Sequence, residues 1–311
     1  MEFWVGVTDK KWYDFLANLK PDEVNFWQPS GTPAFKKQLE LFLFKLHSPL
    51  NYIVGGGYFV TYTNLPISLA WETFGEKNGV SSYFELRNII LEYKKSHGGI
   101  SEPDPEIGCS VLAQPFFFDR DDWIPIPEDW KSNIVRGKTY NTQSDLGAKL
   151  LADVKVRLNK SSEILTSSTS LPISDESTER YGTEYLTRAR IGQSSFRVLV
   201  TNAYYRRCAM TGEKTLPALE AAHIQSYSNN GPHRVSNGLL LRADLHRLFD
   251  RHYITITTDL KIEVSKRIHE KFENGKDYYK LHGQPLAVLP ISPNDFPSKN
   301  YIEWHNQSFY G

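Results

Sequence analysis

Residues 206–256 constrain the fold of this chain most, because they combine short apolar runs with polar residues at fixed spacings. Residues 219–224 (LEAAHI) predict a strand that ends in a histidine, and residues 225–237 are polar and rich in turn formers. Residues 239–241 form a second apolar run, and residues 245–251 have the spacing of a short helix. The predicted order is therefore strand, loop, strand and helix within one compact unit.

Four polar side chains occupy defined positions in this unit. His223 ends the first strand and Asn237 ends the loop, whereas His246 and Asp250 lie four residues apart and share one face of the predicted helix. Asp244 stands where an N-cap is expected. An imidazole and a carboxylate on one helix face predict a platform for a divalent metal, and a neutral histidine can accept a proton from water.

This order, with His223, Asn237 and His246 at spacings of 14 and 9, resembles the ββα-metal finger of HNH nucleases. The sequence LEAAHI…NGLLLRADLHRLFD is similar to the sequences of HNH domains in bacterial restriction endonucleases. The resemblance implies a catalytic group of two residues. His223 is the general base, and Asn237 holds the loop that carries it through hydrogen bonds from its side chain to the backbone. The resemblance also implies that His246 and Asp250 bind a divalent metal, Mg²⁺ or Mn²⁺, with Ni²⁺ and Zn²⁺ as alternatives.

The chain departs from that family's pattern at one position. Many HNH sites carry Asp or His directly before the general base as an additional metal ligand, but this chain has Ala222. Glu220 lies three residues before His223, so in a regular strand it points to the opposite face. The third metal ligand therefore stays open. His233 and His252 have no partners in the pattern and are expected to be exposed.

Basic residues gather around this unit although the whole chain has no net charge. Residues 180–254 contain eleven Lys or Arg against five Asp or Glu, which gives this segment a charge of +6. Such a patch favours phosphate binding, because neutralised phosphates release counterions. Residues 184–207 predict a helix with one apolar and one basic face. The expected DNA contacts are Arg190, Arg197, Arg206 and Arg207.

Residues 1–142 predict a domain of short strands with Gly and Pro punctuation and a few helices, which suggests a small β-barrel with helices outside. On the stretches VGVTDKKW and VNFWQPSG it resembles the PUA-like superfamily of base-reading barrels, which includes SRA and EVE domains. The resemblance implies a modified base flipped into a cage of aromatic rings. Trp27 and Tyr58 are the predicted pocket residues, since each lies at a strand–loop junction. The glycine run 55–57 predicts a bulge or tight turn.

Two further segments complete an α+β organisation. Residues 143–180 predict a helix followed by a linker rich in Ser and Thr. Residues 181–311 form the predicted HNH endonuclease domain. The two cysteines, Cys109 and Cys208, exclude a zinc site of four cysteines. The chain start lacks the layout of a signal peptide, and no run approaches about 18 apolar residues. We therefore expect no membrane partner and a cytoplasmic location.

The predicted function is that of a metal-dependent DNA endonuclease that restricts double-stranded DNA with modified bases, read by the N-terminal domain. A homodimer is expected, because one finger cuts one strand. Two alternatives stay open. One is an HNH nuclease effector of antiphage defence whose N-terminal domain senses a protein or a small ligand. The other is a non-catalytic module that binds nucleic acid.

Overall fold

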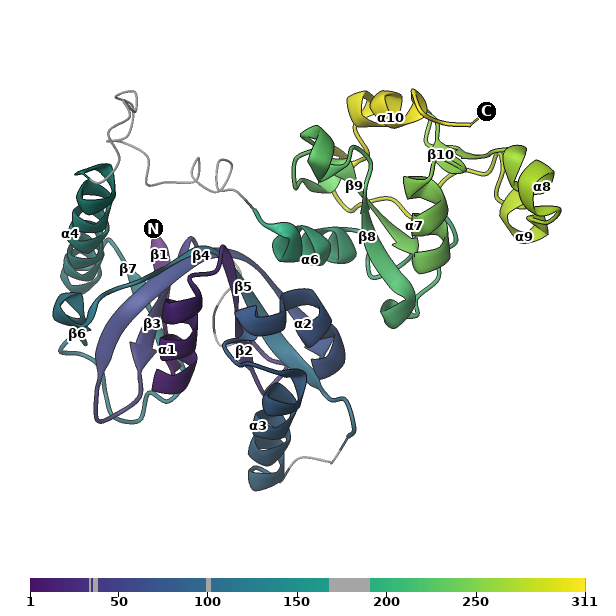
Figure 1. Cartoon of the computed structure of the whole chain (residues 1–311). Helices are drawn as coiled ribbons and strands as arrows, with labels where there is room; N and C mark the ends of the chain where they lie inside the picture. Colours follow the sequence, from purple (N-terminus) through teal and green to yellow (C-terminus); the bar gives the residue numbers. More distant parts are fainter. Residues whose placement is uncertain (34, 36–38, 99–101, 168–190, 311) are drawn as a thin grey trace. The chain divides into compact units, whose positions relative to one another are not determined.

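The computed structural model describes residues 1–33, 35, 39–98, 102–167 and 191–310 (Figure 1). The chain divides into two compact units, Met1–Arg190 and Ile191–Gly311, which are described separately. Arg190 and residues 168–180 of the predicted helix-and-linker segment lie outside the described residues, whereas the helix of that segment continues to Ser167. None of the described helices is long and apolar enough to cross a membrane.

The N-terminal unit is built on a sheet in which seven strands are described, in the order β2-β5-β4-β3-β1-β7 with β6 paired to β4. Strands β1 and β3 are parallel and the other pairs are antiparallel. The strands are β1 (Glu2–Thr8), β2 (Glu23–Gln28), β3 (Leu41–Leu46), β4 (Tyr52–Pro66), β5 (Glu106–Phe117), β6 (Ile124–Pro125) and β7 (Gly137–Asn141). The helices are α1 (Lys10–Leu19), α2 (Ile67–Phe74), α3 (Tyr83–Ser96) and α4 (Asp145–Ser167), with 3-10 turns η1 (Gly75–Asn78) and η2 (Arg120–Asp122).

The sheet is apolar on both faces, and the two-residue alternation of β1 and β3 divides their side chains between two core clusters. In β1, Trp4 belongs to the cluster that contains Trp12 of α1. Its neighbour Phe3 belongs to the other cluster, which contains Val154 of α4. Helices therefore cover both faces of the sheet, with α1 on one face and α4 on the other (Figure 1).

The glycine run 55–57 lets strands β4 and β5 approach closely. A Cβ atom on Gly55 would collide with the carbonyl oxygen of Phe116, which only glycine avoids. The register of β4 against β5 shifts between Gly56 and Tyr58. The predicted bulge is therefore confirmed, and it bends the long strand β4.

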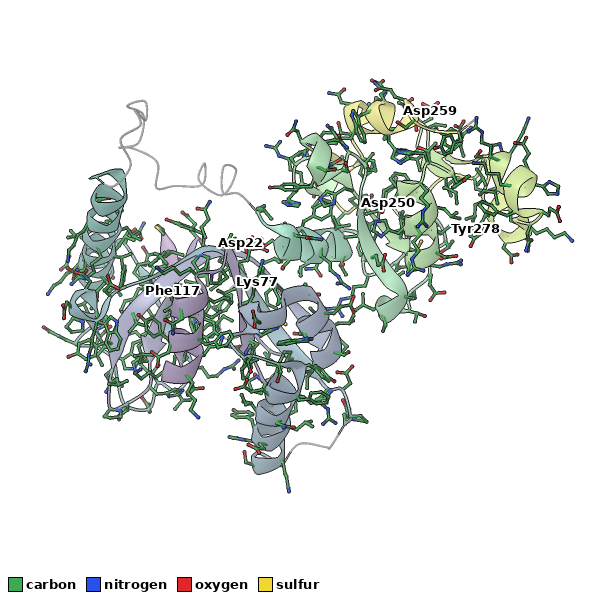
Figure 2. The ribbon with its side chains drawn as sticks, viewed as in Figure 1. Asp22, Lys77, Phe117, Asp250, Asp259 and Tyr278 are labelled. Atoms are coloured by element: carbon green, nitrogen blue, oxygen red, sulfur yellow. The ribbon has the colours of Figure 1, made fainter. Side chains whose placement is uncertain are left out.

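The predicted closed barrel is wrong for the described residues, because strands β2 and β7 end the sheet without pairing to one another. The outer edge of β2 packs against η1 instead. The indole Nε1 of Trp27 donates to the carbonyl oxygen of Asn78 at 2.9 Å. The ammonium of Lys77 lies 2.6 Å from the carboxylate of Asp22 (Figure 2). A helical turn thus packs beside this end strand of the sheet.

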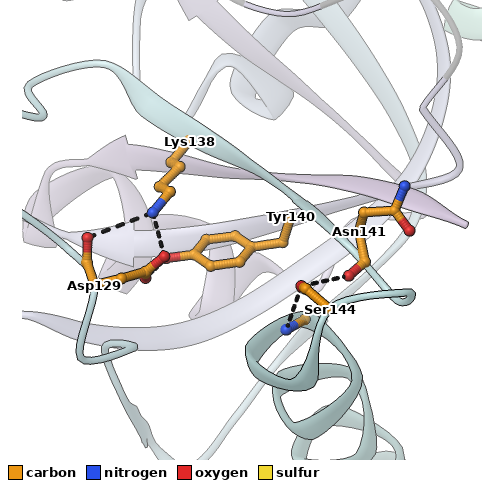
Figure 3. Close-up of polar contacts among 6 residues, drawn as sticks. Asp129, Lys138, Tyr140, Asn141 and Ser144 are labelled. Carbon is orange, nitrogen blue, oxygen red and sulfur yellow. Dashed lines mark hydrogen bonds and ion pairs between the residues drawn. The ribbon is translucent and has the colours of Figure 1, made fainter.

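A polar cluster fixes the other end of the sheet (Figure 3). Asp129 accepts hydrogen bonds from Lys138 and, at 2.8 Å, from the Tyr140 hydroxyl. Burial alone would raise the pKa of Asp129, but the hydrogen bonds from Lys138 and Tyr140 hold it below its usual value. The Ser144 hydroxyl donates to the Asn141 carbonyl oxygen at 2.8 Å, just before α4 begins. Strand β7 is thereby tied both to the preceding loop and to α4.

The C-terminal unit contains the predicted strand–loop–strand–helix order. Strands β8 (Leu219–His223) and β9 (Gly238–Arg242) are antiparallel, with His223 opposite Gly238, and α7 (Ala243–Asp250) follows directly (Figure 1). Phe249 of α7 is fully buried in the core of this unit. The remaining elements are α6 (Gln193–Ala203), η3 (Leu216–Ala218), η4 (Tyr227–Asn229), η5 (Val235–Asn237), β10 (Ile254–Ile256), β11 (Ile262–Val264), α8 (Arg267–Phe272), α9 (Lys276–Tyr279), η6 (Pro293–Asp295) and α10 (Lys299–Asn306).

The predicted N-cap of α7 is wrong. The helix begins two residues earlier than expected, so that Arg242 is the N-cap residue and Asp244 lies in the first turn. The Asp244 carboxylate accepts hydrogen bonds from Nε and Nη2 of Arg242 at 3.0 and 2.6 Å. It therefore pairs with a side chain rather than capping the helix, and this bidentate contact lowers the pKa of Asp244.

Candidate functional site

His246 lies between two carboxylates in the C-terminal unit. Its Nδ1 is 2.7 Å from Oε2 of Glu220, and its Nε2 is 3.3 Å from Oδ2 of Asp250. Asp250 follows one turn later on α7 (Figure 2), whereas Glu220 comes from β8. Glu220 thus reaches the imidazole from the strand, although it was expected to face away from His223.

The two carboxylates determine the charge state of His246. Burial of the ring would lower its pKa, but the contacts with Asp250 and then Glu220 outweigh burial and raise it. Because a metal ion binds the neutral imidazole, the raised pKa means that the ion competes with a proton for His246.

His223 is held by aromatic contacts at the end of β8. Its ring stacks on Phe196 of α6, with ring centroids 3.8 Å apart and an interplanar angle of 13°. Its Nε2 lies 3.0 Å from Nδ1 of His233. Burial, followed by the influence of His233 and His246, lowers the pKa of His223 to about 4. His223 is therefore neutral near pH 7 and carries one nitrogen lone pair that can accept a proton.

Two of the sequence-based expectations fail here. His233 has a clear partner in His223 and is half-buried, stacked against Tyr227 with ring centroids 4.5 Å apart. His252 is also half-buried, with its ring centroid 4.7 Å from that of His305. Neither contact follows a short sequence spacing, which is why the motif did not predict them.

Asn237 is fully buried and binds the loop between β8 and β9 with its whole amide group. Its Oδ1 accepts from the backbone N–H of Gln225 at 2.8 Å. Its Nδ2 donates to the carbonyl oxygens of Gln225 and Pro232, both at 3.0 Å. This arrangement closes the loop that carries His233 and fixes its start just after His223.

The described side chains around His246 offer two neighbouring ligand atoms for a divalent metal, but not a set of three. Within the described ranges, no group of three or more His, Cys, Asp or Glu side chains is arranged to hold a metal ion. His246 Nε2 and Asp250 Oδ2 nevertheless lie 3.3 Å apart, a separation that two ligands of one ion can have. Ala222 is fully buried in the core of this unit. A carboxylate at that position would be buried without water.

The predicted DNA-contacting arginines are only partly described. Arg190 lies outside the described residues. Arg197 lies on α6, and Arg206 and Arg207 follow that helix, with Arg207 donating from Nε to the carbonyl oxygen of Gly212 at 3.3 Å. Their roles in DNA binding stay predictions.

The N-terminal unit has a cavity of about 430 Å³, lined by the end of β1, the start of α1, the end of β2 and one face of α3. Trp27 lines it, as does Arg136, whose Nη2 donates to Gln28 Oε1 at 3.1 Å and to the Thr32 carbonyl oxygen at 2.6 Å. Tyr58 is not among the lining residues and packs against the core cluster that contains Phe3. The structure therefore separates the two predicted pocket residues, because Trp27 on β2 lines the cavity and Tyr58 on β4 does not.

With this geometry described, the chain can be compared with known proteins. Residues 208–257 match the family model described as HNH endonuclease. The chain thus carries an HNH endonuclease domain, and the match contains His223, Asn237, His246 and Asp250. Among curated proteins, the chain matches none.

Two solved structures show a weak likeness. An ASCH protein from Zymomonas mobilis has 11% sequence identity and a TM-score of 0.34, with 48% of this chain and 94% of that protein covered. A modification-dependent restriction endonuclease, TagI, has 13% identity and a TM-score of 0.30, with 93% of this chain and 76% of that protein covered. At these TM-scores neither likeness supports a conclusion about substrate.

Proposed function

We propose that this protein is a metal-dependent endonuclease that hydrolyses phosphodiester bonds of double-stranded DNA. The observation that carries the proposal is the position of neutral His223 within the same HNH segment as the His246–Asp250 pair. Hydrolysis needs a base that accepts a proton from water and a cation that balances the charge developing on phosphate. His223 supplies the base, and the His246–Asp250 pair supplies a site for the cation.

His246 through Nε2 and Asp250 through Oδ2 would hold the ion, and Glu220 would accept the hydrogen bond from Nδ1 of His246. This resembles the usual support of a metal-bound histidine by a second carboxylate. A bound Mg²⁺ or Mn²⁺, or alternatively Ni²⁺ or Zn²⁺, supplies electrostatic stabilisation of the phosphate oxygens. Asn237 contributes by holding the loop next to His223 rather than by touching DNA.

The N-terminal unit is proposed to select DNA that carries a modified base. The support is the cavity of about 430 Å³, which is large enough for a base and is lined by the rings of Trp12, Trp27 and Tyr93. Aromatic rings offset the cost of unstacking a base, and Arg136 adds a guanidinium whose N–H groups can donate to a carbonyl group of a base. A homodimer is proposed because two strands have to be cut.

The test is cleavage of one plasmid sequence prepared with unmodified, methylated and hydroxymethylated cytosine, each with Mg²⁺, Mn²⁺, Ni²⁺, Zn²⁺ or EDTA. We expect metal-dependent cleavage that is faster on one modified substrate. Equal rates on all three substrates would remove modification reading from the proposal but keep the nuclease. Absence of cleavage with every metal, together with salt-sensitive DNA binding, would favour the non-catalytic alternative.

A second candidate for the N-terminal unit is the sensing of a small ligand, because the same cavity has the volume of a ligand site. The two candidates differ in what they require of DNA. A domain that recognises modified bases binds modified oligonucleotides through the residues that line the cavity. A domain that senses a small ligand instead makes the cleavage of unmodified DNA depend on an added small molecule.

A further inference from the structure

Next to the proposed general base lies a second imidazole that the nuclease motif leaves without a role. The Nδ1 atom of His233 is 3.0 Å from the Nε2 atom of His223, which is a normal hydrogen-bond distance between ring nitrogens. Two neutral imidazoles in this contact share one hydrogen, so one ring donates and the other accepts. The contact therefore determines which nitrogen of His223 is available to chemistry.

The surroundings hold both rings in place. Phe196 stacks on His223 with ring centroids 3.8 Å apart, and Tyr227 stacks on His233 at 4.5 Å with an interplanar angle of 9°. Asn237 holds the connecting loop by its bond to the Pro232 carbonyl oxygen, directly before His233. The pair is thus fixed by two stacking partners and by a buried amide, rather than by one contact between mobile side chains.

The contact also limits how His223 can meet water. Its Nε2 faces His233, so a water molecule that loses a proton to His223 has to approach Nδ1. Nδ1 can accept that proton only when the ring's own hydrogen is on Nε2. This tautomer is the one in which His223 donates from Nε2 to the lone pair on Nδ1 of His233.

We propose that His233 is a positioning residue that holds His223 in the tautomer protonated on Nε2, with Nδ1 unprotonated toward the substrate. This inference rests on the proposed function of His223 as the general base. His233 itself does not touch the reacting atoms. Its effect is on the fraction of His223 in the productive tautomer and on the direction of the imidazole ring, which together set the rate of proton removal.

The first test measures the tautomer directly and does not require cleavage. Two-dimensional ¹⁵N–¹H spectra of the metal-free full chain at pH 7, with His223 assigned through His223→Gln, distinguish protonation on Nε2 from protonation on Nδ1. We expect His223 in the Nε2-protonated form. Predominance of the Nδ1-protonated form would overturn the inference, whether or not the wild-type protein cuts DNA.

The second test separates the hydrogen bond from the stacking. His233→Phe keeps a ring against Tyr227 but removes the nitrogen. His233→Asn removes the ring but keeps a hydrogen-bond acceptor near the position that Nδ1 of His233 occupies. We expect single-turnover cleavage with saturating Mn²⁺ to slow at least about 10-fold in His233→Phe and to recover to within about 3-fold of wild type in His233→Asn. DNA affinity should stay unchanged in both variants.

Equal rates in wild type and His233→Phe would overturn the inference, as would equal slowing in both variants. The control is His269→Phe, which changes an exposed histidine on α8 and should cut at the wild-type rate. Thermal melting identifies any variant that fails to fold, and the spectra of the wild-type chain then still decide the matter. Failure of wild-type cleavage counts against the proposed function alone.

Discussion

The carboxylate of Glu220 lies 2.7 Å from Nδ1 of His246, across the β8–α7 junction and 26 residues away in the chain. It orients the imidazole so that Nε2 faces Asp250. This relationship explains how the site can work with Ala222 before the general base. The acidic side chain near the proposed metal site comes from Glu220, two residues earlier on β8, rather than from position 222.

Replacing Glu220 by Gln should weaken metal binding by about 10- to 100-fold, because a neutral amide supports the basicity of His246 less than a carboxylate does. Calorimetric titration of the DNA-free protein with Mn²⁺ measures this directly. Glu270→Gln, at an exposed position of α8, is the matched control. An unchanged affinity in Glu220→Gln would show that His246 needs no such partner.

Replacing either His246 or Asp250 by alanine should abolish most of the Mn²⁺ binding in a calorimetric titration of the DNA-free protein. The reason is that each side chain provides one of the two adjacent donor atoms of the proposed site. DNA affinity without metal should change less than about 3-fold, since the arginines that are expected to contact phosphates are the same in both variants. Wild-type Mn²⁺ affinity in both variants would place the metal elsewhere.

Asn237→Ala should lower the free energy of unfolding of the C-terminal unit by about 2–4 kcal/mol, because it leaves one N–H and two carbonyl groups of the loop without their partner. Urea denaturation measures the change. Asn229→Ala, in the exposed part of the same loop, should cost much less. Equal losses in the two variants would show that the buried amide does not hold the loop.

Acid should destabilise the fold through His305, which is buried against Phe249 with ring centroids 3.9 Å apart. Burial lowers its pKa from 6.5 to about 4. Between these values the unfolded chain binds more protons than the folded one, so stability is fully present above about pH 6.5 and falls as the pH drops toward 4. The loss reaches roughly 3 kcal/mol.

Urea denaturation at a series of pH values measures this dependence. His305→Phe keeps the ring stack and should reduce the slope of stability against pH by about one proton between pH 4.5 and 6. The exposed His269 again provides the control, because His269→Phe should leave the slope close to that of wild type. An unchanged slope in His305→Phe would assign the acid sensitivity to other groups.

The C-terminal unit could be predicted well from the sequence because its information is local. The apolar runs of β8 and β9, the turn-rich loop and the spacing of His246 and Asp250 are each visible within a short stretch of sequence. The contact of His223 with His233 could not be predicted in this way. It depends on how the loop folds back, and that is fixed by the buried amide of Asn237 rather than by residue spacing.

The N-terminal unit was harder to predict for a physical reason. Strand identity follows from alternation of apolar residues, but closure of a sheet depends on which edges find partners. Here Asn78 accepts the hydrogen bond from Trp27, and a 3-10 turn packs beside β2. Likewise, Gln28 and Arg136 meet at the cavity although 108 residues separate them. No local pattern predicts such a pair, which is why Tyr58 was expected in the pocket and Arg136 was not.

The most direct test of the account compares wild type with His223→Ala on supercoiled plasmid, with DNA affinity measured in parallel by fluorescence anisotropy. With Mn²⁺ present we expect nicking by wild type, a loss of at least about 100-fold in His223→Ala, and equal DNA affinity in the two proteins. Wild-type rates of nicking by His223→Ala would contradict the assignment of His223 as the general base, and with it the central claim about this site.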